Sequence, residues 1–439
     1  MQKTPLGLVF FPAVDWMISE THPERQERLI YTYDQLVEEG ILDLPSIREY
    51  KPRMASWQDI ERTHICMPSA QSIVTNAHLV SAGGTLVAAD AVMKKQVDRS
   101  FALVRPPGHH AMRVSHGIRG FCTINIEAVM VDYLRKMYGV ERIAIVDTDV
   151  HHGDGTQEIF YHDPNVLFIS FHQDGRTLYP GSGFPDELGS PYAYGSTINL
   201  PLLPGTGDKG VHMLFDQLIA PILADFKPQL VINSAGQDNH FTDELASLQM
   251  TAQGYALLAD KLKADIAVLE GGYSIEAALP YINTGIILAM AGMDYSKVVE
   301  PEQRGLYAED KRTIARVEQL VDHMGAIWHN RDKLKKAELA KANGVWQRSK
   351  PIYYDTDGIS EQQTETAYYC DKCSGYLTID SYARGSRFHE QSVFASVVWY
   401  DSCSECENKA YNAALQEKKR GGHQKHVVQN KLKDVYEEI

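Results

Sequence analysis

Residues 143–155, IAIVDTDVHHGDG, decide the fold of this chain. The stretch opens with a continuous run of isoleucine, valine and alanine, as in a strand that is buried on both faces. Similar runs occur at 101–104, 166–171, 230–233 and 266–269, with helical patterns such as 210–226 between them. This alternation predicts an α/β domain with a parallel sheet covered by helices.

Polar clusters follow four of these strands directly. In an open parallel sheet, ligands bind beyond the carboxyl ends of the strands, so the four clusters should converge on one site. The clusters are Arg105 to His110, Asp147 to Gly155, Ser234 to Asp238 and Glu270 to Tyr273.

Asp149 and His151 are candidate ligands of a metal ion. Residues i and i+2 of an extended segment point to the same side, so both can reach one cation. Asp238, after another strand, could supply a third ligand. Two carboxylates and one imidazole suit Zn²⁺ or Fe²⁺ and leave a position open for water and substrate. Ordinary surface turns contain the same residue types, so the pair alone does not decide the matter.

Two further elements add to this site. The adjacent His109 and His110 need polar partners if they are buried, and Asp147 and Asp154 are suitable because a carboxylate behind an imidazole fixes its tautomer. Tyr273 follows two glycines that allow a sharp turn, and its hydroxyl could then face a developing oxyanion.

In combination and order, these motifs resemble the histone deacetylase family, in particular class II enzymes and prokaryotic relatives such as acetylpolyamine amidohydrolases and acetoin-utilisation proteins. The resemblance covers roughly residues 5–298. It includes the segments His22 to Leu29, Gly120 to Cys122 and Tyr179 to Gly183.

The resemblance implies an arginase/deacetylase fold, an eight-stranded parallel sheet between helix layers. It also implies that Asp149, His151 and Asp238 are zinc ligands. It implies that His110 is the general base that takes a proton from the attacking water, with His109 as its electrostatic partner. Asp147 and Asp154 are implied as two supporting acids, and Tyr273 as the residue that stabilises the tetrahedral intermediate. A structural K⁺ is implied beside Asp147, Asp149, His151, Ser170 and Phe171.

The same resemblance points to the substrate. Phe121 and Tyr179 match the aromatic walls of an acyl-lysine tunnel, although the second wall is usually Phe. Leu245 is neutral where polyamine-cleaving members carry an acid, which favours acetyl-lysine over acetylpolyamine, while Asp243 and Glu244 keep the question open. The leading interpretation is a zinc-dependent amide hydrolase that removes acetyl groups from lysine. The alternatives are a small-molecule deacetylase and a non-catalytic acyl-lysine binder, and too few Asp ligands are found for arginase-like dimanganese chemistry.

Two C-x-x-C pairs form a separate feature near the end of the chain. Cys370, Cys373, Cys403 and Cys406 predict a structural Zn²⁺ in a zinc-ribbon-like module that lies away from the chemistry. Unligated thiols or a redox pair are the alternative. The sequence thus predicts a catalytic domain over 1–298, a helical extension and linker over 299–366, and the cysteine module with a polar tail over 367–439.

Charge and composition limit the partners. The net charge of -14 disfavours direct binding of nucleic acid and suits cationic partners, such as acetylated lysine-rich peptides or polyamines. Without a signal peptide or an apolar run of the ~18–20 residues that a membrane helix needs, we expect a cytoplasmic protein with no membrane association. The sequence is compatible with a homo-oligomer but does not reveal one.

Overall fold

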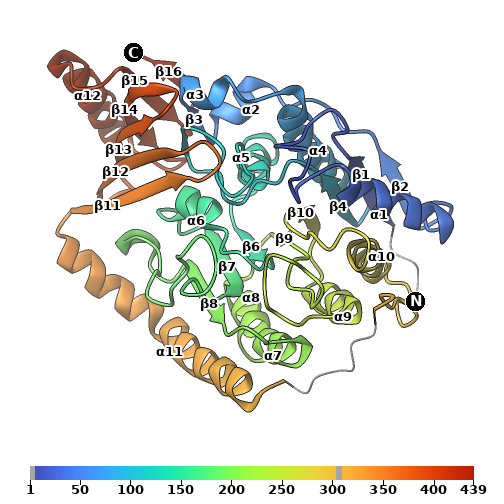
Figure 1. The fold of residues 1–439 in the computed structure, drawn as a ribbon. Helices are drawn as coiled ribbons and strands as arrows, with labels where there is room; N and C mark the ends of the chain where they lie inside the picture. The colour runs from blue at the N-terminus through green and yellow to red at the C-terminus, as the bar shows by residue number, and fades with distance from the viewer. Residues whose placement is uncertain (1–4, 303–308) are drawn as a thin grey trace.

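The computed structural model describes residues 5–302 and 309–439. At its centre is an eight-stranded sheet in which every neighbouring pair of strands is parallel (Figure 1). The predicted sheet is therefore confirmed. Its strands, in spatial order, are β2 (Ile47–Tyr50), β1 (Leu6–Phe11), β4 (Arg99–Val104), β10 (Ile266–Leu269), β9 (Leu230–Ala235), β6 (Ile143–Asp147), β7 (Val166–Gln173) and β8 (Thr197–Leu202).

Helices cover both faces of this sheet, and alternate residues of each strand enter one of two cores. In β4, Phe101 and Leu103 join one core, whereas Ala102 and Val104 join the other. The second core packs against α4 (Asn76–Met93) and α5 (Ile126–Tyr138). The first packs against α1 (Glu27–Glu38), α7 (Asp208–Leu214), the π-helical η2 (Phe215–Ile219), α8 (Ala220–Phe226), α9 (Ala252–Leu262), α10 (Leu279–Met290) and α11 (Lys311–Ala342).

Short elements complete the catalytic part of the chain. The helices among them connect strands, and the strands form a small parallel pair beside the main sheet. They are α2 (Trp57–Glu61), α3 (Pro68–Gln71), α6 (Asp154–Phe160), the 3₁₀-helix η1 (Pro191–Ala193), β3 (Ile65–Cys66) and β5 (Val114–Ser115).

The helical extension expected from residue 301 is α11, which begins at Lys311. Val317, Leu320 and Met324 of this helix are buried, and Val321 is half-buried. Residues 303–308 of the expected segment lie outside the described residues. No helix in the described ranges is long and apolar enough to cross a membrane.

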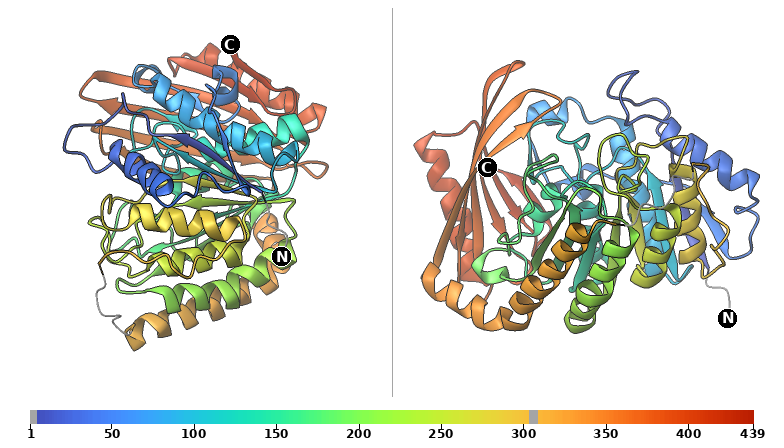
Figure 2. Two further views of the ribbon diagram at one scale, coloured as in Figure 1. Left: turned by 90° about the vertical axis from the view of Figure 1, so that its right-hand side faces the viewer. Right: turned by 60° about the horizontal axis from the view of Figure 1, so that its bottom comes forward.

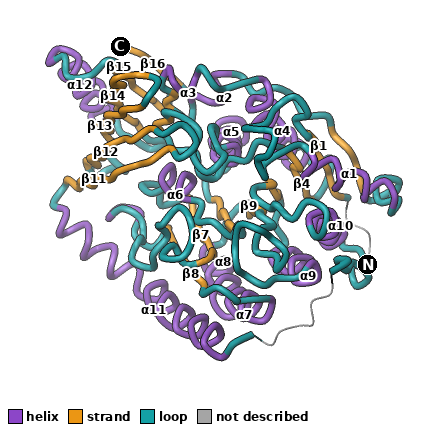
Figure 3. Tube along the Cα trace, viewed as in Figure 1, coloured by secondary structure: helices purple, strands orange, loops and turns teal. Residues whose placement is uncertain are grey.

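The C-terminal region differs from the prediction of a linker that ends at residue 366 and a cysteine module with a polar tail over 367–439. Six strands form one sheet there, with a helix before the last two strands (Figure 3). These elements are β11 (Val345–Tyr354), β12 (Ile359–Tyr368), β13 (Tyr376–Gly385), β14 (Phe388–Val398), α12 (Ser404–Arg420), β15 (Lys425–Asn430) and β16 (Val435–Glu438). In β12 the buried positions include Glu361, Gln363 and Glu365, and this polar inward face hides the alternation that normally marks a strand.

The second sheet packs directly on the N-terminal part of the chain, which contains the central sheet. One face forms a common core with β3 and β5, through Ile65 and Val114 against Leu377 and Ile379, while α12 covers the other face (Figure 2). A buried ion pair joins Lys431 to Asp132 across the boundary at 2.7 Å. The C-terminal sheet is thus a structural part of the molecule.

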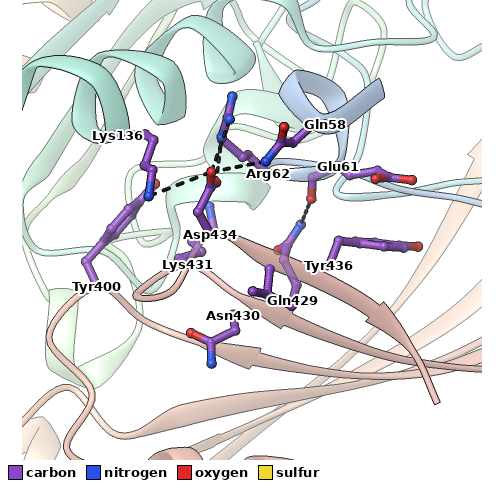
Figure 4. A pocket seen from close by; sticks show the side chains of 11 residues that line it. Gln58, Glu61, Arg62, Lys136, Tyr400, Gln429, Asn430, Lys431, Asp434 and Tyr436 are labelled. Carbon is purple, nitrogen blue, oxygen red and sulfur yellow. Dashed lines mark hydrogen bonds and ion pairs between the residues drawn. The ribbon is translucent and has the colours of Figure 1, made fainter. Parts of the chain in front are cut away.

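A cavity of about 270 Å³ lies along this boundary, between α2 and the strands β15 and β16 (Figure 4). Three of its charged side chains pair with one another: Arg62 Nε lies 2.6 Å from Asp434 Oδ1, and Lys136 Nζ lies 3.8 Å from Asp434 Oδ2. These contacts hold the β15–β16 turn against the catalytic part of the chain.

Candidate metal centre and active site

The four predicted polar clusters do converge. They follow β4, β10, β9 and β6, which are consecutive neighbours in the central sheet. Because parallel strands end at one edge, the residues after them share a site. The register pairs Asp147 with Ser234 and Leu269 with Ala235.

Asp149, His151 and Asp238 form a compact ligand set. One ligand atom from each lies within 4.8 Å of the others. His151 Nδ1 is 3.1 Å from both Asp149 Oδ1 and Asp238 Oδ2. Burial, followed by the negative charge of Asp149, raises the pKa of Asp238 to about 7. A nitrogen and two carboxylate oxygens around one point fit a Zn²⁺ ion, whose charge would relieve this repulsion.

Backbone groups fix the two carboxylates. Gly271 N donates to Asp149 Oδ2 at 2.7 Å, and Val150 N donates to Asp238 Oδ1 at 2.8 Å. A Cβ on Gly271 would lie 2.2 Å from Asp238 Oδ2, and one on Gly236 would lie 2.1 Å from Asp149 Oδ2. Only glycine leaves room for the carboxylates at these two positions.

Each histidine of the adjacent pair has its own acid. His109 Nδ1 is 3.1 Å from Asp147 Oδ2, and His110 Nδ1 is 2.8 Å from Asp154 Oδ1. Both rings are buried, and their centroids are 4.1 Å apart. Because each Nδ1 is bound to a carboxylate, each Nε2 is left for chemistry.

The surroundings separate the pKa values of the two imidazoles. Burial, followed by the positive charges of His109 and Arg119, lowers the pKa of His110 well below its usual range. Burial also lowers the pKa of His109, but Asp149 and Asp147 outweigh it and raise the pKa. A pair divided in this way suits one neutral base and one charged partner.

Tyr273 lies on a tightly held turn. Its backbone N–H donates to Asp243 Oδ2 at 2.7 Å, and the Arg28 guanidinium lies 4.9 Å from its ring centroid. Burial raises the pKa of Tyr273 well above its usual range, so the hydroxyl stays protonated and can donate a hydrogen bond.

The expected tunnel residues also lie here. The rings of Phe121 and Tyr273 meet edge-on, with their centroids 5.7 Å apart. The ring centroids of Tyr179 and His110 are 5.2 Å apart. Leu245 is half-buried, and its N–H donates to Asp243 Oδ1 at 3.0 Å. Both oxygens of Asp243 thus accept backbone hydrogen bonds, so Asp243 positions Tyr273, whereas Glu244 is exposed.

Two of the residues implied for K⁺, Asp149 and His151, belong to the metal triad itself. Asp147 of β6 is the register partner of Ser170 in β7, and Phe171 follows it in the core. Ser170 Oγ lies 2.8 Å from His172 Nδ1. The K⁺ site stays a prediction.

Sequence reasoning assigned no role to several supporting residues. Glu270 Oε2 accepts from Gly108 N at 2.7 Å and from His109 N at 3.1 Å, and so fixes the histidine turn. Arg119 binds both oxygens of Asp154, at 2.9 and 2.7 Å. Arg28, in the predicted His22–Leu29 segment, donates to Gly272 O at 2.7 Å. Glu270 and Arg28 could have been identified from the sequence, because both are charged residues within motifs of the family resemblance.

The four C-terminal cysteines meet at the end of the second sheet. One pair lies in the β12–β13 turn and the other at the start of α12, and their sulfur atoms lie within 4.8 Å of one another. Lys372 N and Gly375 N each donate to a cysteine sulfur at 3.4 Å, an arrangement that stabilises thiolates. All six cysteines are free. The set fits a closed tetrahedral Zn²⁺ site.

Loss of this cysteine site should affect more than the module itself. We expect the Cys370→Ser/Cys373→Ser variant to lose one zinc per chain, because such sites supply folding free energy of about 10 kcal/mol. Since the sheet shares a core with β3 and β5, turnover should fall as well. Metal analysis, limited proteolysis and activity measure this. Cys66→Ala, outside the cluster, should keep its zinc, and unchanged zinc in the double variant would contradict the assignment.

Comparison with known proteins agrees with this geometry. The histone deacetylase domain family matches residues 66–289. A probable deacetylase of Archaeoglobus fulgidus is 49% identical over 65% of this chain and 85% of its own. The chloroplastic histone deacetylase 14 of Arabidopsis thaliana is 39% identical over 47% of this chain and 52% of its own.

A solved structure shows the same fold. The crystal structure of the HDA15 HD domain aligns with a TM-score of 0.65 and 27% identity, and the alignment covers 77% of this chain and 99% of that one. The family match over residues 66–289 includes the ends of β4, β6, β9 and β10, which carry the candidate catalytic residues. The chain therefore belongs to the histone deacetylase family.

Proposed function

We propose that this protein removes acetyl groups from lysine side chains by hydrolysis, with Zn²⁺ held by Asp149, His151 and Asp238. The observation that carries the proposal is the single site formed by this triad, the two acid-backed histidines and Tyr273. A Zn²⁺ ion there would polarise the amide carbonyl and lower the pKa of water.

The chain's own groups would do the remaining work. His110, neutral and anchored to Asp154 through Nδ1, is suited to accept a proton from the attacking water at Nε2. The same nitrogen can then protonate the departing amine. His109 with Asp147 supplies positive charge beside it, and Tyr273 donates to the oxyanion of the tetrahedral intermediate.

An acetylated polyamine is the second candidate substrate. The inward hydrogen bonds of Asp243 and the neutral Leu245 favour lysine over polyamine at this loop. A site that binds acyl-lysine without cleaving it is disfavoured because the general base and its acid are both in place.

Metal removal tests the proposal. The purified protein should hydrolyse an acetyl-lysine peptide, lose activity after dialysis against a chelator, and recover it with added Zn²⁺, because the triad supplies the ligands. Product amine is measured by mass spectrometry. Activity that persists without metal would contradict the proposed mechanism, and hydrolysis of acetylputrescine alone would favour the second candidate.

A further inference from the structure

The turn between β11 and β12, residues 355–358, contacts the active-site loop from outside the matched family domain. Asp355 Oδ1 accepts from Gly120 N at 2.9 Å and from the Tyr179 hydroxyl at 3.1 Å. Asp357 Oδ2 accepts from Ile118 N at 2.7 Å. The C-terminal sheet therefore reaches the loop of residues 117–121.

That loop is the wall of the site. A Cβ on Gly120 would lie 2.3 Å from His110 Cδ2, so the backbone bound by Asp355 rests on the candidate general base. Phe121 follows directly and is contacted edge-on by His22 at 4.3 Å. Asp355 thus contacts one aromatic wall through the hydroxyl of Tyr179. It also binds Gly120, the residue directly before the other aromatic wall, Phe121.

The carboxylate of Asp355 contributes negative charge beside the two aromatic walls, Phe121 and Tyr179. Asp355 is exposed, and its two hydrogen bonds are both accepted by Oδ1. Burial lowers the pKa of His22, and the negative charges of Glu24 and Asp355 oppose that effect. Asp357 pairs with Arg387, but among the described residues no lysine or arginine forms an ion pair with Asp355.

We propose that Asp355 is a specificity-determining residue, which binds a positively charged nitrogen of an acetylated amine at the mouth of the tunnel. This inference rests on the proposed deacetylase function. In free or N-terminal acetyl-lysine the charged α-nitrogen stands five carbons from the acetylated nitrogen, so a stem enclosed by the aromatic walls leaves this charge at the rim. The strongly acidic chain favours approach of such a cation.

A matched pair of substrates isolates this charge. Nε-acetyl-lysine amide carries an α-ammonium group, whereas its Nα-acetylated form is neutral with the same scissile amide and stem. We expect the native protein to prefer the charged form by about 1.5- to 5-fold in kcat/KM, the range for an exposed ion pair. The preference should fall as ionic strength rises.

The Asp355→Asn variant is the test. Asparagine keeps an oxygen for Gly120 N and Tyr179, so the loop stays in place while the charge is lost. The preference should disappear mainly through KM, because hydrolysis of the charged form should fall more than hydrolysis of the neutral form. Asp294→Asn removes an exposed charge beyond the end of α10, and should leave the preference intact.

The outcomes separate the two proposals. Hydrolysis of both amides without a charge preference, or an equal loss on both in Asp355→Asn, would overturn the specificity role and leave the deacetylase function standing. Failure of the native protein to cleave either amide would overturn both. Acetylcadaverine has the same nitrogen spacing without the carboxamide, and cleavage as fast as that of the lysine amide would identify a polyamine as the source of the cation.

Discussion

Replacement of Asp238 by alanine should reduce hydrolysis below detection and remove one of two zinc ions per chain. The side chain supplies one of three ligand atoms within 4.8 Å of one another, and a site with two protein ligands holds Zn²⁺ weakly. The fold should survive, because the variant also removes one of two buried carboxylates that repel each other. Metal content per chain and turnover of an acetyl-lysine peptide measure the effect.

A matched control lies on the same loop. Glu244 is exposed and, unlike Asp243, is not bound to the Tyr273 turn, so Glu244→Ala should keep both zinc ions and full turnover. Full metal occupancy with full activity in Asp238→Ala would refute the ligand assignment. Loss of the second zinc together with the first would show instead that the variant had unfolded.

The central sheet was predictable because a strand that is buried on both faces consists of a continuous run of apolar residues. In β4 and β6 every residue from Phe101 to Val104 and from Ile143 to Val146 is buried, so the strands read as continuous apolar runs. The triad was predictable for a related reason. Asp149 and His151 stand two residues apart at a strand end, where local geometry alone puts them on one side.

The second sheet was not predictable in this way, because β12 has polar residues at buried positions. Glu361 and Glu365 point into the boundary between the two sheets, where Tyr354 and Arg348 bind them, and a strand with acids on its buried face reads as a polar linker. Only the tertiary partners make those positions tolerable in a strand. The partners lie in other strands or in the catalytic part of the chain, which sequence patterns do not place.

The contribution of the second sheet to the active site was beyond sequence reasoning for the same physical reason. Asp355 meets Gly120 across 235 residues of chain, through a single hydrogen bond to a backbone N–H. No local period or motif records such a contact. Arg119 is a comparable case, because its role depends on Asp154 at the far end of another loop.

Tyr273→Phe should slow turnover at least about 100-fold while the fold and both zinc ions stay intact. Loss of one oxyanion donor typically costs about 10²–10³ in kcat. The ring would keep its place, since Arg28 lies over it, Phe121 meets its edge, and Asp243 holds the backbone N–H rather than the hydroxyl. KM should change little, because the donor acts in the transition state.

The ring environment sharpens this test. Burial keeps the Tyr273 hydroxyl protonated, so the missing group in the variant is a neutral donor, and the loss should not depend on pH across the neutral range. Tyr31→Phe removes a hydroxyl from the exposed side of α1 and should leave turnover as it is. A loss below fivefold in Tyr273→Phe would assign the stabilising hydrogen bond to another group. His109 would then be the first residue to examine, since it is the charged donor beside His110 in the same buried site.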